Sequence, residues 1–334
     1  MGGGDVKAPG SYRPVNDKWG RFASLAPKGA AWIIDAKVAR LHPGVVRSLR
    51  APLHVELVTA GEALKSTRAL ERIAPRLLQL PRGGTLVAVG GGTVGDFATV
   101  AAHLVKRGVN LIQVPTTLLA AVDSSVGGKG ALNVGEVKNA LGVFHYPSQT
   151  LLCADFFATL SPAQHREGIA EALKMAVCLD AAVWKNWSRR APPTLELVKT
   201  ARQLKERVCR ADPYEQTGRR SVLNFGHTFG HVIESLSRFR VRHGEAVALG
   251  MLCALDVGRA MEVTPLALGQ QVEAVLAERT GAARPRLASV LENHASEEVE
   301  RLLGADKKSV GNGLRMVLLV RPGLARLVDV PRWR

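Results

Sequence analysis

The sequence is poor in cysteine and in long apolar runs, and each shortage argues against a class of protein. The four cysteines lie far apart and form no Cys-x-x-Cys pair, which argues against a disulfide framework and a thiolate zinc site. No apolar run reaches the roughly 18 residues that span a bilayer, and the first 20 residues have no secretory apolar core. We therefore expect a soluble cytoplasmic protein with no membrane partner and with reduced, buried thiols.

Acidic residues are also scarce, since 29 Asp and Glu face 45 Lys and Arg and leave a formal charge of +16. Such a charge suits nucleic acid, an acidic membrane surface or an anionic small molecule. The basic residues are dispersed, and no basic motif is interleaved with aromatic residues. We therefore predict no nucleic-acid partner.

The first half of the chain has the pattern of an α/β domain. A chain of 334 residues predicts two domains, and residues 1–28, rich in glycine, proline and charge, are interpreted as a flexible lead. Four short apolar runs predict buried strands, at 31–34, 54–58, 85–89 and 111–114. Helical stretches follow the second and third runs, at 63–80, with Pro75 inside it, and up to about 106. Strands that alternate with helices predict a parallel sheet over 29–155.

The second half, 156–334, has mainly helical periodicity, and we predict an all-α domain there. The predicted helices cover 167–179, 194–210, 228–236, 244–261 and 269–279.

Three of the nine histidines, His227, His231 and His243, fall within 17 residues and are flanked by glycines. His227 and His231 share a face if the segment is helical. Neutral imidazoles with a carboxylate suit zinc, so this cluster predicts a metal site. The alternative is a pair of helices separated by glycines.

Gly90, Gly92 and Gly95 form a Gly-x-Gly-x-x-Gly pattern between a predicted strand and a predicted helix. Small residues there let a phosphate approach the N–H groups of a helix N-terminus. The acidic residue that usually binds the ribose is absent, because the next strand ends in Pro115-Thr116-Thr117. A tight turn that needs glycine is the alternative.

Two further clusters carry charge in unusual settings. The segment 123–129, followed by Lys138-Asn139, combines lysines and hydroxyls with glycines, which indicates a phosphate cradle or a polar surface loop. Glu171 and Lys174 lie one helical turn apart among apolar neighbours. They form either a solvated ion pair or a buried pair in which Glu171 is a metal ligand.

These motifs occur in the order found in a known family. The shared segments are Gly90–Asp96, Arg107-Gly108, Gln113–Ala120, Asp123–Lys129, Lys138-Asn139, Glu171-x-x-Lys174, Leu223–His231 and His243-Gly244-Glu245. Over about 61–323 the chain resembles 3-dehydroquinate synthase and the wider sugar phosphate cyclase family.

The resemblance implies an NAD-binding α/β domain, a helical metal-binding domain, an active site between them and a homodimer. It implies zinc or cobalt held by Glu171, His227 and His243. The catalytic candidates are Lys129, Lys138, Asn139, Lys174, Arg220, Asn224 and His231. The substrate-binding candidates are Arg107, Asp123, Lys205, Lys307 and Lys308. The NAD-binding candidates are Asp35, Glu62, Lys65, Gly90, Gly91, Gly92, Gly95, Asp96, Thr116, Thr117 and Thr159.

The activity implied is a lyase of aromatic amino acid biosynthesis (the shikimate pathway), which converts 3-deoxy-D-arabino-heptulosonate 7-phosphate to 3-dehydroquinate and releases phosphate. Related cyclases act on an amino analogue, sedoheptulose 7-phosphate or glucose 6-phosphate, but Arg220 favours an acidic substrate. A metal- and NAD-dependent alcohol dehydrogenase would share the glycine turn and the histidines, and would release NADH. A non-catalytic basic binding protein is a third alternative, which failure to bind zinc or NAD would favour.

Overall fold

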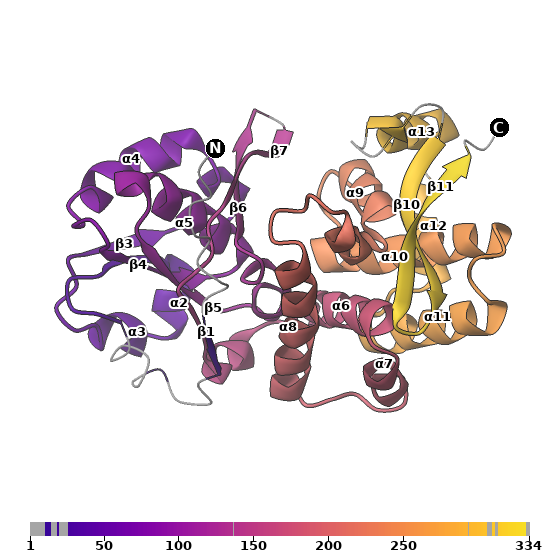
Figure 1. Cartoon of the computed structure of the whole chain (residues 1–334), viewed down its shortest axis with the longest axis horizontal. Coiled ribbons are helices and arrows are strands. Elements are labelled where there is room, and N and C mark those ends of the chain that lie inside the picture. The colour runs from indigo at the N-terminus through magenta and orange to yellow at the C-terminus, as the bar shows by residue number, and fades with distance from the viewer. Residues whose placement is uncertain are drawn as a thin grey trace. The chain divides into compact units, whose positions relative to one another are not determined.

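The computed structural model describes residues 11–14, 19, 26–135, 137–292, 294–305, 309–310 and 313–331. The chain forms two compact units, Met1–His165 and Arg166–Arg334, and many of their helices and strands are labelled in Figure 1. The division falls after residue 165 rather than after 155, because the segment between them includes the short helix η4 (Ala154–Thr159). Phe156 of η4 is buried in the core of the first unit.

A parallel sheet forms the centre of the first unit, and the α/β prediction is confirmed. Its strand order in the described residues is β1-β8-β5-β4-β2-β3, and every pairing is parallel. The strands are β1 (Ser11–Pro14), β2 (Ala31–Asp35), β3 (His54–Val58), β4 (Thr85–Gly90), β5 (Asn110–Pro115) and β8 (Gln149–Leu152).

Helices cover both faces of this sheet. On one face Ile33 and Ala88 pack with residues of α4 (Thr67–Leu77) and α5 (Gly92–Leu104). On the other, Ile34 and Val89 pack with residues of α2 (Ala36–Leu41) and α3 (Gly44–Arg47). Successive strand residues point to opposite faces, so two-sided cover requires the continuous apolar runs seen in the sequence.

Described residues of the predicted lead belong to this fold, which corrects part of that prediction. Ser11–Pro14 form the edge strand β1, paired with β8. Trp19 is 8% exposed, and its Nε1 donates to the Val45 carbonyl over 3.2 Å. An isolated strand and a single tryptophan leave no periodic pattern, so the sequence did not indicate either.

The segment after β5 contains a hairpin that the sequence analysis did not predict. A π-helical turn, η3 (Ala120–Ser124), leads to β6 (Lys129–Val134), which pairs antiparallel with β7 (Val137–Phe144). Part of the predicted polar cluster is therefore held on two hydrogen-bonded strands.

The second unit is mainly helical, as predicted. Its helices are α6 (Pro162–Leu179), α7 (Ala181–Trp187), α8 (Thr194–Ala211), α9 (His227–Leu236), α10 (His243–Ala260), α11 (Leu266–Thr280), α12 (Arg284–Leu291) and α13 (Ser296–Ala305).

An antiparallel sheet corrects the expectation that this unit is entirely helical. It consists of β9 (Ser309–Val310), β10 (Gly313–Arg321) and β11 (Leu324–Pro331). Four consecutive residues of β10, Met316 to Leu319, are buried. A short continuous apolar run does not distinguish a strand from a buried helix, which explains the omission.

Helix α10 packs unusually closely against α9. A Cβ atom on Gly250 would lie 2.1 Å from the Gly226 carbonyl oxygen, which directly precedes α9. Only glycine permits this approach, and it brings together the two helices that begin with His227 and His243.

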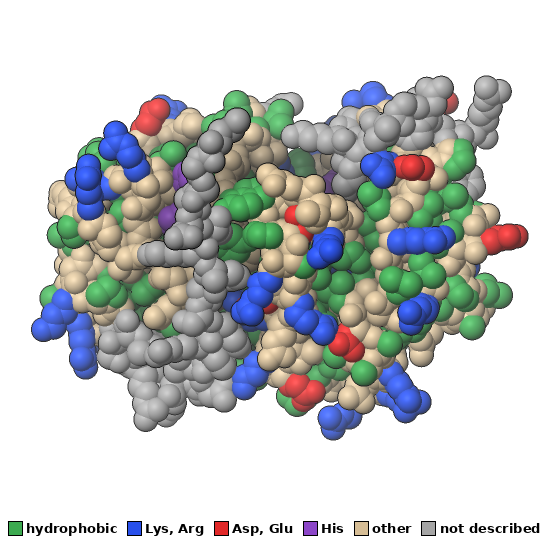
Figure 2. All heavy atoms as spheres, in the orientation of Figure 1, with side chains coloured by type: hydrophobic (Ala, Val, Ile, Leu, Met, Phe, Trp, Pro, Cys, Tyr) green, Lys and Arg blue, Asp and Glu red, His purple; other side chains and the backbone are tan. Residues whose placement is uncertain are grey.

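Basic side chains are dispersed on the face of the molecule in Figure 2, with acidic and apolar side chains between them. The absence of a nucleic-acid partner stays a prediction. Within the described residues, no helix is long and apolar enough to cross a membrane.

Candidate functional site

Three potential metal ligands converge in the second unit. Glu171 lies on α6, His227 begins α9 and His243 begins α10. One ligand atom from each lies within 4.8 Å of the others. The Glu171 side chain is fully buried, whereas those of His227 and His243 are 13% and 34% exposed. Two imidazoles and a carboxylate are typical ligands of a catalytic zinc ion with an open position.

The atoms of this cluster face one another. Glu171 Oε1 lies 3.5 Å from His227 Nε2 and 3.7 Å from His243 Nε2. Within the described part of the chain, this buried oxygen has no hydrogen-bond partner. Leaving such an oxygen unsatisfied costs about 1–3 kcal/mol or more. A divalent cation would remove that cost, so the residues present fit a metal ion.

The environment keeps His227 neutral, which is the form that binds metals. Burial, followed by the charge of Lys174 and two neighbouring imidazoles, lowers the pKa of His227 well below its ordinary value. His227 Nδ1 lies 3.4 Å from the Phe225 carbonyl oxygen. Because a carbonyl only accepts, the ring proton belongs on Nδ1, and the Nε2 lone pair faces Glu171.

Lys174 completes the buried part of the cluster. Its Nζ donates to Glu171 Oε2, and its side chain is 2% exposed. Of the two alternatives for this pair, the structure therefore has the buried one. One carboxylate oxygen contacts the ammonium, while the other faces the two histidines.

His231 lies beside the cluster without joining it. Its ring centroid is 5.7 Å from that of His227, as the four-residue spacing predicts. Its side chain is exposed, and it is not among the three converging ligands. The partners of His227 come from two other helices rather than from its own.

The predicted cofactor turn lies at a switch point of the parallel sheet. Gly90 ends β4, α5 begins at Gly92, and β4 pairs with β2, which ends at Asp35. The chain crosses from β2 to β3 on one side and returns to β4 on the other. Ligands of open parallel sheets bind at the carboxyl ends of strands at such points. A cavity of about 10 Å³ lies there, lined partly by Gly90, Gly91 and Gly95.

Several candidates from different segments meet beside this turn. Lys65 Nζ lies 2.7 Å from Asp96 Oδ2 and 2.5 Å from Asn139 Oδ1. Burial raises the pKa of Asp96, although the Lys65 ammonium opposes this rise. Lys138 Nζ lies 3.8 Å from Glu62 Oε1. Two residues expected to bind NAD, Lys65 and Glu62, thus contact two of the catalytic candidates, Asn139 and Lys138.

The remaining cofactor candidates are held by local hydrogen bonds. Thr116 donates its N–H to the Gly90 carbonyl over 2.9 Å, and Thr117 Oγ1 accepts from the Ala120 N–H over 3.1 Å. The exposed Thr159 donates its hydroxyl to the Phe156 carbonyl. Asp35 accepts from the Lys37 N–H and caps α2.

Arg107 lies at the opposite end of α5 from the glycine turn. It follows the helix in η2 (Val105–Arg107), and its side chain is exposed. The 13 residues of α5 correspond to about 20 Å. Within the first unit, Arg107 is therefore remote from the glycine turn.

The substrate candidates differ widely in exposure. Lys205 and Arg220 are 7% and 3% exposed, whereas Lys129 is exposed and Asp123 is half-buried. Arg220 Nη1 donates to the Pro213 carbonyl over 3.0 Å. Asn224 ends the short helix η5 (Arg219–Asn224), just before His227. Lys307 and Lys308 lie outside the described residues.

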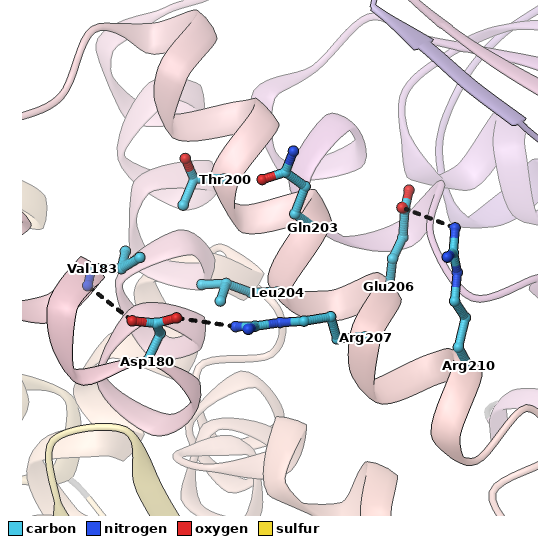
Figure 3. A pocket seen from close by; sticks show the side chains of 8 residues that line it. All are labelled: Asp180, Val183, Thr200, Gln203, Leu204, Glu206, Arg207 and Arg210. Atoms are coloured by element: carbon cyan, nitrogen blue, oxygen red, sulfur yellow. Dashed lines mark hydrogen bonds and ion pairs between the residues drawn. The ribbon is translucent and has the colours of Figure 1, made fainter.

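A larger cavity, of about 450 Å³, lies between α7 and α8 and contains none of the predicted site residues (Figure 3). Asp180 pairs with Arg207 over 3.2 Å across it, and Glu206 pairs with Arg210 over 4.0 Å. The opposite charges on its wall offset one another, so we assign it no chemistry.

Sequence reasoning missed two carboxylates near His243. Glu234 Oε2 lies 3.4 Å from His243 Nδ1. Glu167 accepts from Arg242 over 3.4 Å and from the Gly244 N–H at the start of α10. Glu234 lies seven residues after His227 on the same helix. That spacing places Glu234 on the same helix face as His227, and it is the sequence signal from which Glu234 could have been found.

The chain belongs to the 3-dehydroquinate synthase family. The model of the 3-dehydroquinate synthase N-terminal domain matches residues 55–167, and that of the C-terminal domain matches 168–309. The chain is 34% identical over 318 residues to the 3-dehydroquinate synthase of Enterococcus faecalis (strain ATCC 47077 / OG1RF), covering 91% of this chain and 87% of that protein. It is 36% identical over 328 residues to that of Thermosynechococcus vestitus (strain NIES-2133 / IAM M-273 / BP-1), covering 92% and 87%.

Solved cyclase structures have the same fold. A 2-deoxy-scyllo-inosose synthase complexed with carbaglucose-6-phosphate, NAD+ and Co2+ has a TM-score of 0.79 and 25% identity, covering 96% of this chain and 93% of that chain. ValA, a 2-epi-5-epi-valiolone synthase from Streptomyces hygroscopicus subsp. jinggangensis 5008 with NAD+ and Zn2+ bound, has a TM-score of 0.85 and 23% identity, covering 99% and 96%. This second likeness concerns the fold.

Proposed function

We propose that the chain is an NAD- and metal-dependent 3-dehydroquinate synthase, a carbon–oxygen lyase. It converts 3-deoxy-D-arabino-heptulosonate 7-phosphate to 3-dehydroquinate and releases phosphate. The observation that carries the proposal is the convergence of Glu171, which is buried, with the partly buried His227 and His243 in a chain matched by both family domains. The NAD- and metal-bound cyclases of the same fold support the choice of cofactors.

When bound, the cofactors supply Lewis acidity at the substrate hydroxyls and a reversible hydride acceptor. In the proposal, Glu171, His227 and His243 hold the divalent metal, and the Lys174 ammonium stays paired with Glu171. The turn from Gly90 to Gly95 offers N–H groups to the pyrophosphate of NAD. The other NAD candidates, Asp35, Glu62, Lys65, Asp96, Thr116, Thr117 and Thr159, keep that role.

The substrate carries a phosphate and a carboxylate, which need cations at separate places. In the proposal, the following cations and amides supply them: Arg107, Lys129, Lys138, Asn139, Lys205, Arg220, Asn224, Lys307 and Lys308. Asp123 contacts the substrate as well, and His231 can relay a proton near the phosphate. We also expect a homodimer, which light scattering of the purified protein would measure.

Incubation with 3-deoxy-D-arabino-heptulosonate 7-phosphate, NAD and Zn2+ tests this function. We expect release of one phosphate for each 3-dehydroquinate seen by NMR, with no net NADH. Accumulation of NADH would instead indicate an alcohol dehydrogenase. Preferential turnover of sedoheptulose 7-phosphate, glucose 6-phosphate or the amino analogue would move the assignment to another cyclase.

A further inference from the structure

We infer that Glu234 is a positioning residue, which orients His243 for metal binding. The inference rests on the proposed metal site and is independent of the substrate. Glu234 Oε2 lies 3.4 Å from His243 Nδ1, which is slightly longer than a typical N–H···O hydrogen bond. The Glu234 side chain is 13% exposed, so its carboxylate is largely shielded from water.

The chemistry of this contact determines which ring nitrogen carries the proton. An ionised carboxylate only accepts hydrogen bonds, so the proton of the neutral His243 ring belongs on Nδ1. The lone pair is then on Nε2, and His243 Nε2 lies 3.7 Å from Glu171 Oε1. Glu234 therefore selects the tautomer and the ring orientation in which His243 can bind the metal shared with Glu171.

His227 has the same arrangement with a different acceptor. Its Nδ1 faces the Phe225 carbonyl oxygen, and its Nε2 faces Glu171 Oε1. In each of the two histidines, Nδ1 thus faces a hydrogen-bond acceptor and Nε2 faces the Glu171 carboxylate. The acceptor is backbone for His227 but a side chain for His243, so only the second can be removed by substitution.

The nearby Glu167 has a different role. It accepts from Arg242 and from the Gly244 N–H, and a Cβ on Gly244 would lie 2.4 Å from Glu167 Cα. Glu167 therefore holds the start of α10 against α6, whereas Glu234 acts on the imidazole. Helix α9 supplies both the ligand His227 and the residue that orients the ligand on α10.

Outer carboxylates that orient metal-bound histidines are typically worth 10- to 100-fold in metal affinity. The test is Co2+ titration of the full-length apoprotein without substrate, followed by the visible absorption of the bound ion and by competition with a chromophoric chelator. We expect Glu234→Ala to weaken Co2+ binding about 10- to 100-fold and to change the absorption band. Glu234→Gln, which still presents an acceptor, should lose less.

Two variants separate position from charge and from general effects. Glu234→Asp keeps the charge but withdraws the carboxylate by one methylene, so it should lose Co2+ affinity as Glu234→Ala does. It therefore provides the test if the alanine variant folds poorly. Glu298→Ala is the matched control, because Glu298 Oε2 lies 3.0 Å from Nδ1 of His294, outside the ligand cluster. It should bind Co2+ as the parent does.

Parent-like affinity in folded Glu234→Ala and Glu234→Asp would overturn the inference, as would equal losses in the alanine and glutamine variants. A parent that binds no Co2+ would instead overturn the metal site of the proposed function. A parent that binds Co2+ but does not cyclise the substrate would contradict only the catalytic proposal.

Discussion

At the residue scale, burial decides what each charged side chain can do. Glu171 and Lys174 would form an ordinary solvated pair on a helix surface, but both are almost fully buried here. Their burial makes the second oxygen of Glu171 costly to leave without a partner, and two imidazoles face that oxygen. Residue identity supplies the candidate ligands, and their burial would make a bound cation favourable.

Loss of Arg220 should lower the turnover of a substrate that has a carboxylate more than that of one that has none. A hydrogen bond to a charged group contributes roughly 1.5–3 kcal/mol, so Arg220→Ala should lower kcat/KM for the acidic seven-carbon substrate about tenfold or more. Sedoheptulose 7-phosphate, which has no carboxylate, should lose less. Steady-state phosphate release on both substrates measures this, and equal losses would contradict the assignment of Arg220 to the acidic group.

Gly92 should be needed for NAD binding, because α5 begins at this residue, at the proposed pyrophosphate site. Gly92→Val should weaken NAD binding about tenfold or more, because side-chain atoms would occupy the space of the phosphate. Fluorescence titration with NAD measures the effect. Gly44→Val is the control, since a Cβ at Gly44 meets nothing within 4 Å. Unchanged NAD affinity in folded Gly92→Val would exclude this placement.

At the scale of elements, the contact between α9 and α10 determines whether two of the ligands meet. Gly250→Ala should destabilise the protein by about 1–3 kcal/mol and weaken metal binding, because the new methyl would lie 2.1 Å from the Gly226 carbonyl. Urea unfolding and Co2+ titration measure both effects. Gly269→Ala on α11, where the nearest atom is 3.5 Å away, should be neutral or stabilising. Parent-like stability of Gly250→Ala would show that the helices can separate without cost.

An ion-pair network joins α10, α11 and α12 and should make stability depend on pH. Burial raises the pKa of Asp256, but its pairs with Arg284 and Arg259 outweigh this and hold that pKa below its ordinary value. The hydrogen bond from Arg284 also lowers the pKa of Glu273. The network therefore stabilises the fold fully above the unfolded-state values of about 4, and this contribution is lost as pH falls through the folded-state values.

Arg284→Met tests the network through urea unfolding at pH 7 and pH 3. The variant should be less stable than the parent at pH 7, and the difference should shrink at pH 3, because the unfolded-state carboxylates, with pKa values of about 4, bind protons there. A difference that is the same at both pH values would show that Arg284 acts through packing alone.

At the scale of the whole molecule, the proposed reaction needs the metal and NAD together. Removal of the metal with a chelator should abolish phosphate release, and Zn2+ or Co2+ should restore it, because Glu171, His227 and His243 would lose the ion between them. The measurement is phosphate release before and after dialysis, with circular dichroism to confirm that the apoprotein stays folded. Full activity after complete metal removal would contradict the proposed mechanism.

The sequence by itself determined the elements whose signal is local. Continuous apolar runs predicted four strands of the parallel sheet, and helical periodicity predicted most helices of the second unit. The glycine turn was also readable, since a strand, a turn and a helix are consecutive in the chain. The hairpin β6–β7 was not predicted from the sequence, because its strands contain lysine, glycine and asparagine and form no continuous apolar run. The sheet β9–β11 was not predicted, because a short apolar run does not distinguish a strand from a buried helix.

Only the tertiary structure decided which of these side chains meet. The four-residue spacing brought His231 beside His227, yet the partners of His227 are Glu171 from α6 and His243 from α10. The tertiary structure likewise places Glu234 next to Nδ1 of His243 and pairs Lys65 with Asp96 and Asn139. Helical period determines which residues share a face, but the packing of one face against another depends on contacts between distant segments. Glycines such as Gly250 permit those contacts, and no local pattern in the sequence records them.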